Sequence, residues 1–220
     1  MVGASGCGKS TLFKIITGLI EPANGEIMLQ SSPSTNRLGQ IAYMPQQDLL
    51  LPWRTVLDNC LLPWEIKPAY SKKETINIIR DMLSRFGLAE VEKKYPHELS
   101  GGMKQRVAFL RTLIAGGRSG LMLLDEPFGA LDAITKREIH RWLLSIWGEL
   151  NQTIMLITHD LEEALLLSDR IYLMPGANQG ELQEIIVNFP RPRHYKMNFD
   201  PQFILLREEL ERRLHETYIF

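Results

Sequence analysis

The chain has 220 residues, of which 45% are hydrophobic, and this suits one large domain or a domain with a small subdomain. Its 25 Lys and Arg residues balance 26 Asp and Glu residues, so we expect no basic surface for nucleic acid. No apolar run approaches the ~20 residues that cross a bilayer, and the glycine-rich start does not fit a signal peptide. The cysteines are Cys7 and Cys60, which excludes a disulfide framework or a zinc cluster and predicts a reducing, cytoplasmic compartment. Any role at a membrane would then come through a partner.

The first part of the chain alternates short β-forming runs with amphipathic helical patterns, which predicts an α/β domain. Strands are expected over residues 25–30 and 40–44. A helix is expected after Lys9, with Gly18 near its end. One face of that helix should carry Leu12, Ile15, Ile16 and Leu19.

The middle segment, residues 49–99, shows helical patterns and no convincing strand, so we interpret it as a helical subdomain inserted into the α/β core. Ser71 and Glu74 form a capping-box pattern at the start of a helix, and Gly87 is a plausible end for it. The apolar face of this helix is expected to be Ile76, Ile79, Leu83 and Phe86.

In the last part, the apolar runs 121–124 and 153–158 predict buried parallel strands. Asp160 together with Glu163 is expected to cap the helix that follows. Residues 170–174 and 181–187 predict a strand pair joined by the turn 175–180. A charged helix is predicted from Pro201 on, with an apolar stripe of Leu206, Leu210 and Leu214.

The segment from Gly3 to Ser10 fits the phosphate-loop pattern G-x-x-x-x-G-K-[ST] at every fixed position. Its glycines let several backbone N–H groups point at one phosphate in front of a helix N-terminus. Lys9 would supply a point charge to the phosphates and Ser10 a hydroxyl to Mg²⁺. The alternative is an ordinary glycine-rich turn, but the apolar helix that follows favours phosphate binding. The predicted nucleotide contacts are Gly3, Ser5, Gly6, Cys7, Gly8, Lys9, Ser10 and Thr11.

Cys7 occupies an unconstrained position of this loop, and two interpretations stay open. In the first, a small residue simply fits there. In the second, the helix N-terminus favours the thiolate and makes Cys7 sensitive to alkylation, and bound ATP would then slow its labelling.

A pair of acids, Asp125 and Glu126, follows the apolar run 121–124. Ligands bind at the carboxyl ends of strands in α/β sheets. Asp125 would therefore hold Mg²⁺ through water, and Glu126 would act as the general base that polarises the attacking water. Two solvated acids at a strand end are the alternative, but the phosphate loop in the same chain favours catalysis.

The run Leu99-Ser-Gly-Gly-Met-Lys-Gln-Arg106 resembles the signature motif of ABC transporter ATPases. The hydroxyl of Ser100 and the amides of Gly101 and Gly102 would form a second anion-binding nest at a helix start. A plain helix cap with glycines is the alternative for the isolated pattern. Its distance ahead of the Asp-Glu strand makes the resemblance specific.

Further positions follow in the order found in ABC ATPases. Gln46 resembles the glutamine that senses the γ-phosphate through Mg²⁺ and water, Gly129–Asp132 resembles the D-loop, and His159 resembles the switch histidine. The resemblance covers residues 2 to about 192. It implies a P-loop NTPase (RecA-like) α/β core with a parallel sheet and an inserted α-helical ABC subdomain. The implied parts are residues 1–48 and 111–190 for the core, 49–110 for the helical subdomain and 191–220 for a helical tail.

The resemblance also implies a mechanism with ATP and Mg²⁺. Two such domains, identical or paired, would close head to tail around two ATP molecules. The catalytic residues would be Lys9, Gln46, Glu126 and His159, and the metal ligands Ser10, Gln46 and Asp125. In this arrangement they face Ser100, Gly101 and Gly102 of the other domain, with Asp132 also near the nucleotide.

The segment Gln47–Trp53 resembles the nitrate/sulfonate/taurine-type importer ATPases, in which this region lies beside the transmembrane permease. Leu50 is expected to be core, whereas Trp53 is either core or interface. The implied protein is a peripheral subunit on the cytoplasmic face of the membrane. It would import a small solute, such as a small anion, that a substrate-binding protein delivers. The alternative is a soluble ABC ATPase of DNA repair or translation control.

Two departures from the family pattern stand out. The family has strands and an adenine-stacking aromatic residue ahead of the phosphate loop, whereas here Met1 and Val2 alone precede Gly3. We therefore expect the frame to start upstream or the chain to be a fragment; alternatively, Met1 is the true start and the product binds ATP poorly. Residues 109–120 replace an alanine-rich helix and short turn, which predicts a longer loop there.

Overall fold

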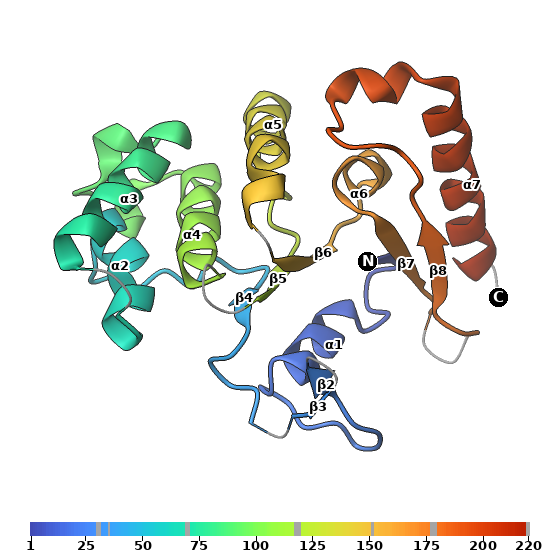
Figure 1. The fold of residues 1–220 in the computed structure, drawn as a ribbon, viewed down its shortest axis with the longest axis horizontal. Coiled ribbons are helices and arrows are strands. Elements are labelled where there is room, and N and C mark those ends of the chain that lie inside the picture. Colours follow the sequence, from blue (N-terminus) through green and yellow to red (C-terminus); the bar gives the residue numbers. More distant parts are fainter. Residues whose placement is uncertain are drawn as a thin grey trace. The chain divides into compact units, whose positions relative to one another are not determined.

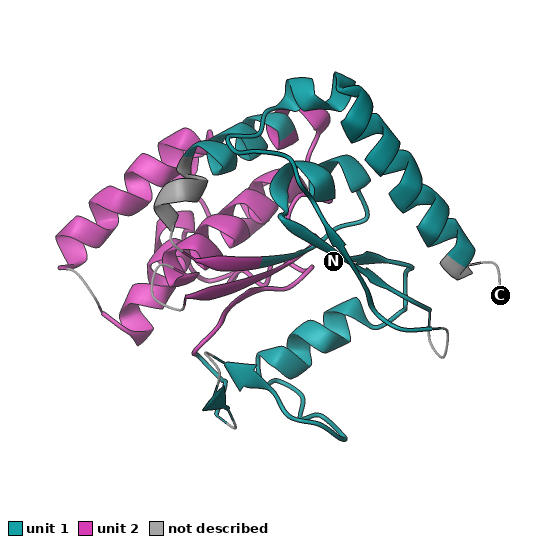
Figure 2. Ribbon diagram, turned by 45° about the vertical axis from the view of Figure 1, so that its right-hand side comes forward, with its two compact units in different colours: residues 1–39, 137–151, 155–220 teal, residues 40–136, 152–154 magenta. Residues whose placement is uncertain are grey.

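The computed structural model describes residues 1–29, 32–34, 36–68, 71–116, 120–150, 152–176 and 180–218, with the backbone alone for residues 146–150 and 217–218 (Figure 1). The chain forms two compact units (Figure 2). Unit 1 comprises residues 1–39, 137–151 and 155–220, and unit 2 comprises residues 40–136 and 152–154. The predicted division into core, inserted subdomain and tail stays a prediction.

The sheet of unit 1 has the order β1-β7-β8. Strand β1 (Val2–Gly3) pairs in parallel with β7 (Arg170–Met174), with Val2 opposite Leu173. Strand β8 (Gln183–Ile186) pairs with β7 in antiparallel orientation, which confirms the predicted strand pair. Residues 177–179 of the predicted turn lie outside the described residues. Val2 and Gly3 thus form a short strand at the start of the phosphate loop, and the expected lack of further upstream strands stays a prediction.

Helix α1 (Lys9–Ile16) follows the loop as predicted, but its buried side chain is Phe13. The predicted face was wrong at Leu19, which is exposed. The reason is that the helix ends just before Gly18, as predicted: Gly18 has a left-handed φ of 79°, and the amides of Gly18 and Leu19 donate back to the carbonyls of Ile15 at 3.1 Å and Lys14 at 2.9 Å. Beyond it, β2 (Met28–Leu29) and the unpredicted β3 (Ser32–Pro33) form an antiparallel pair. Gln30 of the predicted strand lies outside the described residues.

The tail belongs to the core of unit 1. Helix α6 (Leu161–Leu167), the short helix η3 (Tyr195–Phe199) and α7 (Pro201–Tyr218) follow one another in this unit. Leu210 and Leu214 of the predicted stripe are buried and Leu206 is partly buried. Phe203, which was not part of the predicted stripe, is fully buried as well. The shared core cluster contains Val2, Ala164, Leu165, Ile171, Leu173, Val187, Phe203, Leu210 and Leu214.

Unit 2 contains the parallel pair β4 (Ala42–Met44) and β5 (Leu121–Asp125), with Ala42 opposite Met122. Strand β6 (Thr153–Ile157), whose first residues belong to this unit, completes the order β4-β5-β6. Helix α5 (Ala133–Leu150), which sequence analysis did not specify, begins in unit 2 and continues into unit 1.

The middle segment is helical, as predicted. It contains α2 (Val56–Ile66), α3 (Lys72–Arg85), η1 (Ala89–Val91), η2 (Pro96–Glu98) and α4 (Gly101–Gly116). The capping box at α3 is confirmed: the Ser71 hydroxyl accepts from the Glu74 amide at 3.2 Å, and the Glu74 carboxylate accepts from the Ser71 amide at 2.9 Å. Residues 117–119 of the predicted longer loop lie outside the described residues.

Candidate functional site

The phosphate loop in unit 1 is shaped by glycines at two demanding positions. A Cβ on Gly3 would lie 2.6 Å from the carbonyl oxygen of Met174, so only glycine fits against β7 there. Gly8 has a φ of 103° and forms the N-cap of α1, a left-handed conformation that favours glycine. Within residues 1–29, α1 has no side-chain cap and no acidic residue in its first turn. Its first N–H groups are therefore suited to an anion.

The ammonium group of Lys9 lies inside this loop. It donates to the carbonyls of Gly3 at 2.8 Å and Ala4 at 2.6 Å, and it lies 3.6 Å from Cys7 Sγ. Backbone carbonyls thus hold a positive charge next to the uncapped helix start. Of the other predicted contacts, Ser5, Gly6 and Thr11 are exposed and Ser10 is half-buried.

His159 follows β6 in the same unit, at the edge from which the phosphate loop emerges. The backbone of Met1 connects them: its amine donates to the carbonyl of Leu156 at 2.5 Å, and its carbonyl accepts from the Thr158 amide at 3.2 Å. Burial, followed by the charge of Lys9, lowers the pKa of the Met1 amine to about 5. The structure therefore brings the loop and the predicted switch histidine, which is exposed, to one edge of unit 1.

The start of α6 confirms the predicted cap, because the Asp160 carboxylate accepts from the Glu163 amide at 3.1 Å. The Asp160 amide donates to the Thr158 hydroxyl at 3.0 Å, and this hydroxyl in turn donates to the Glu163 carboxylate.

Unit 2 carries the acid pair at the carboxyl end of β5. Asp125 is only 2% exposed. Burial, followed by the negative charge of Asp125, raises the pKa of Tyr43 on the neighbouring β4 to about 12. A buried carboxylate oxygen is a hard donor of the kind that Mg²⁺ prefers. Among the described residues, no three or more His, Cys, Asp or Glu gather as a metal cluster.

Glu126 adopts an unusual backbone conformation, with a φ of 50°. The Gln46 amide donates to the Glu126 carboxylate at 3.1 Å. Because β4 and β5 are parallel neighbours, their carboxyl ends deliver both residues to one edge. The structure thus brings together the predicted general base and the predicted γ-phosphate sensor. A non-glycine residue at positive φ costs about 1–3 kcal/mol and is typical of functional sites.

Sequence analysis missed Gln105, which holds the backbone around Glu126. Its side-chain amide donates to the Glu126 carbonyl at 2.8 Å, and its amide oxygen accepts from the Ala130 amide at 2.9 Å. The side chain lies on α4 and is 7% exposed. Its place inside the run Leu99–Arg106, which resembles the signature motif, was the signal that could have identified it.

Ser100 and Asp132 act in this structure as helix caps. The Ser100 hydroxyl accepts from the Met103 amide at 3.3 Å and opens α4 with Gly101 and Gly102. The Asp132 carboxylate accepts from the amides of Ile134 at 3.1 Å and Thr135 at 3.0 Å, ahead of α5. Hydrogen bonds from Thr135, above all from its backbone, lower the pKa of Asp132. Their predicted contacts with nucleotide stay predictions.

The predicted permease-facing segment is anchored from two helices. Arg111 on α4 donates to the carbonyls of Asp48 at 2.8 Å and Leu49 at 2.9 Å. Asn59 on α2, which is fully buried, accepts from the Leu51 amide at 2.8 Å. Leu50 is buried, as expected of a core residue, whereas Trp53 is 72% exposed. Across the described stretches, no helix combines the length and the apolar composition needed to cross a membrane.

Comparison with known proteins gives consistent matches. Residues 1–129 match the family described as ABC transporter. The chain is 50% identical to the formylaminopyrimidine import ATP-binding protein ThiZ of Halalkalibacterium halodurans, over 79% of this chain and 66% of that protein. It is 42% identical to the nitrate import ATP-binding protein NrtD of Synechococcus elongatus, over 95% of this chain and 77% of that protein.

Among solved structures, the dimeric structure of MJ0796, a bacterial ABC transporter cassette, matches with a TM-score of 0.74 and 30% identity, and the match covers 86% of this chain and 84% of that one. These findings confirm the predicted family and the P-loop α/β fold. The named solutes of the relatives differ, so no solute transfers from them. The chain belongs to the ABC transporter family, as an ABC-type ATPase subunit of the import class.

Proposed function

We propose that this chain binds ATP with Mg²⁺, hydrolyses it with Glu126 as general base, and drives import of a small solute through a transmembrane permease. The observation that carries the proposal is the contact of 3.1 Å between Gln46 and the Glu126 carboxylate at the end of β5. The amide donor orients this carboxylate, and a general base must be held in position to accept a proton from water.

Phosphate binding is assigned to the loop of unit 1. Lys9 would exchange its bonds to the carbonyls of Gly3 and Ala4 for the β- and γ-phosphates. The uncapped N–H groups at the start of α1 add fixed partial positive charge. Both contacts stabilise negative charge without any proton transfer, which suits a phosphoryl group whose charge spreads over its oxygens.

The ligands that we propose for Mg²⁺ are the Ser10 hydroxyl, the Gln46 amide oxygen and the buried Asp125 carboxylate, since each offers an oxygen of the kind that Mg²⁺ prefers. When bound, the ion would neutralise developing charge on the phosphates. His159 would hold the γ-phosphate or the attacking water from its place beside the phosphate loop.

A second cassette, identical or paired, is the first partner that we propose. Ser100, Gly101 and Gly102 at the start of α4 offer hydroxyl and amide donors to a nucleotide held by that cassette. The MJ0796 cassette was solved as a dimer. Closure around ATP and release after hydrolysis would then supply the movement that a permease follows.

The permease would bind at Gln47–Trp53, where an exposed tryptophan stands on a segment anchored by Arg111 and Asn59. This places the chain at the cytoplasmic face of the membrane as a peripheral subunit, with a substrate-binding protein acting on the other side. For the solute we propose a small anion or a related small molecule, with nitrate, sulfonate and taurine as the compounds to test first.

The test is Glu126→Gln, with Glu90→Gln as a matched surface control, since Glu90 is exposed in η1. We expect Glu126→Gln to keep ATP binding and to lower hydrolysis by about 10²- to 10⁴-fold, because a general base contributes that much. The control should hydrolyse ATP at the unmodified rate. Turnover of Glu126→Gln close to the unmodified rate would refute the assignment.

A further inference from the structure

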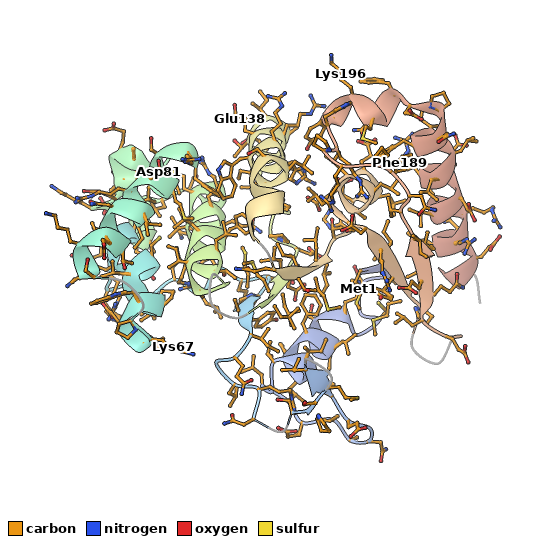
Figure 3. All side chains as sticks on the ribbon, viewed as in Figure 1. Met1, Lys67, Asp81, Glu138, Phe189 and Lys196 are labelled. Atoms are coloured by element: carbon orange, nitrogen blue, oxygen red, sulfur yellow. The ribbon has the colours of Figure 1, made fainter. Side chains whose placement is uncertain are left out.

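A buried polar network lies behind His159 in unit 1, and the proposed function does not use it. It consists of Thr158, His140 and Glu163, which are 3%, 1% and 3% exposed, together with the half-buried Tyr195. Tyr195 comes from η3 in the tail, next to Lys196, which is labelled in Figure 3. A charged carboxylate at this depth requires hydrogen-bonding partners.

The hydrogen bonds of this network converge on the Glu163 carboxylate. Glu163 accepts from the Thr158 hydroxyl at one oxygen and from His140 Nε2, at 2.8 Å, at the other. His140 Nδ1 then accepts from the hydroxyl of Tyr195. Burial, followed by the charge of Glu163, raises the pKa of that hydroxyl and keeps it a donor. Each link in this assignment has one donor and one acceptor.

The network ends on the turn that carries His159. The Thr158 hydroxyl, oriented by Glu163, accepts from the Asp160 amide at 3.0 Å. The bonds of Thr158 and Asp160 therefore hold the backbone on both sides of His159. Its exposed side chain depends on this turn for its position.

Stacking connects the tail to α5, and polar contacts connect it to α6. The rings of His140 on α5 and Tyr195 stack with centroids 5.9 Å apart, and the Arg137 guanidinium lies 5.8 Å from the Tyr195 centroid. Glu162 on α6 accepts from Arg207 at 2.6 Å and from Asn198 at 3.1 Å. The tail thus contacts the beginning of α6 through two hydrogen bonds to Glu162.

We propose that Tyr195 and His140 are positioning residues for His159, acting through Glu163 and Thr158, so that the tail segment 191–218 sets the rate of ATP hydrolysis. The inference rests on the proposed function, because it assigns a task to the tail in service of the switch histidine. Displacement of a catalytic group by about 1 Å can cost about 100-fold in rate, so small shifts of this turn matter.

The experiment compares Tyr195→Phe with Phe199→Ala in the full chain. Tyr195→Phe keeps the stacked ring and removes the hydroxyl, and Phe199, which is 83% exposed in the same short helix, is the matched control. Two quantities are measured: hydrogen exchange of the Asp160 amide, and kcat and KM for ATP. In Tyr195→Phe, we expect the Asp160 amide hydrogen to exchange faster. We also expect kcat to fall by about tenfold to 100-fold while KM for ATP stays unchanged. Phe199→Ala should change neither quantity.

If Tyr195 had a merely structural role, Tyr195→Phe would change KM together with kcat, or Phe199→Ala would also change the measured quantities. Unchanged exchange at Asp160, or faster exchange with an unchanged kcat, would overturn the inference. Glu163→Gln, which keeps the side-chain shape, is the second variant and should give the larger effect on both quantities. If the unmodified chain hydrolyses no ATP, the proposed function fails, while the exchange of Asp160 still decides whether the tail holds the turn.

Discussion

The side-chain amide of Gln46 donates to the carboxylate of Glu126 at 3.1 Å, although the residues lie 80 positions apart in the chain. The contact arises because β4 and β5 are adjacent parallel strands that end at the same edge. The amide orients the carboxylate that would accept the proton of the attacking water. A predicted sensor of the γ-phosphate thus contacts the predicted base directly.

Gln105→Leu should slow hydrolysis while leaving ATP binding intact. The substitution removes the bonds of Gln105 to the Glu126 carbonyl and the Ala130 amide, so the strained backbone at Glu126 loses its support. We expect a loss of up to about 100-fold in kcat from misplacement of the base. Steady-state ATPase and nucleotide-binding assays would measure it, and an unchanged kcat would contradict this role for Gln105.

Trp53→Ala should leave the ATPase of the isolated chain unchanged and uncouple transport. Trp53 is 72% exposed, so truncation removes little packing within the subdomain. Leu49→Ala, at another exposed apolar position of the same segment, is the comparison. Solute uptake and ATPase activity are measured with the permease in vesicles. Unchanged uptake by Trp53→Ala would remove Trp53 from the proposed interface.

The cysteines should differ in reactivity. Burial raises the pKa of the Cys60 thiol to about 12, and the thiolate, the reactive form, is then scarce at neutral pH. Iodoacetamide at about pH 8 should label the half-buried Cys7 and spare Cys60 until the protein unfolds. Mass spectrometry of the unmodified chain and of Cys7→Ser would measure labelling. Label on Cys60 in folded protein would show that its burial is incomplete.

Phe203→Ala should destabilise unit 1 strongly, since Phe203 is fully buried in the cluster that contains Leu165 and Ile171. Truncating a buried phenylalanine costs about 3–5 kcal/mol. Leu205→Ala is the control on the same helix: Leu205 is 65% exposed, and surface changes usually stay within about 0.5 kcal/mol. Urea unfolding would measure both variants. Equal stabilities would mean that the tail is not part of the core.

Local features of this protein were predictable from sequence. The phosphate-loop pattern, the Ser71 capping box, the α6 cap at Asp160 and the paired strands β7 and β8 all depend on neighbouring residues or on short-range alternation. The first helix shows the limit of such reasoning, since periodicity extended its apolar face to Leu19 whereas the left-handed Gly18 ends the helix before that residue.

The motif spacing of Gly3–Ser10, Ser100–Gly102 and Asp125–Glu126 was sufficient, without coordinates, to determine the family and the kind of chemistry. Only the tertiary structure decided what holds those residues in place. The support of Glu126 by Gln105 joins positions 21 apart, and the contact of Tyr195 with His140 joins positions 55 apart. Neither pairing leaves a periodic trace in the sequence, because the partners meet only when strands and helices pack together.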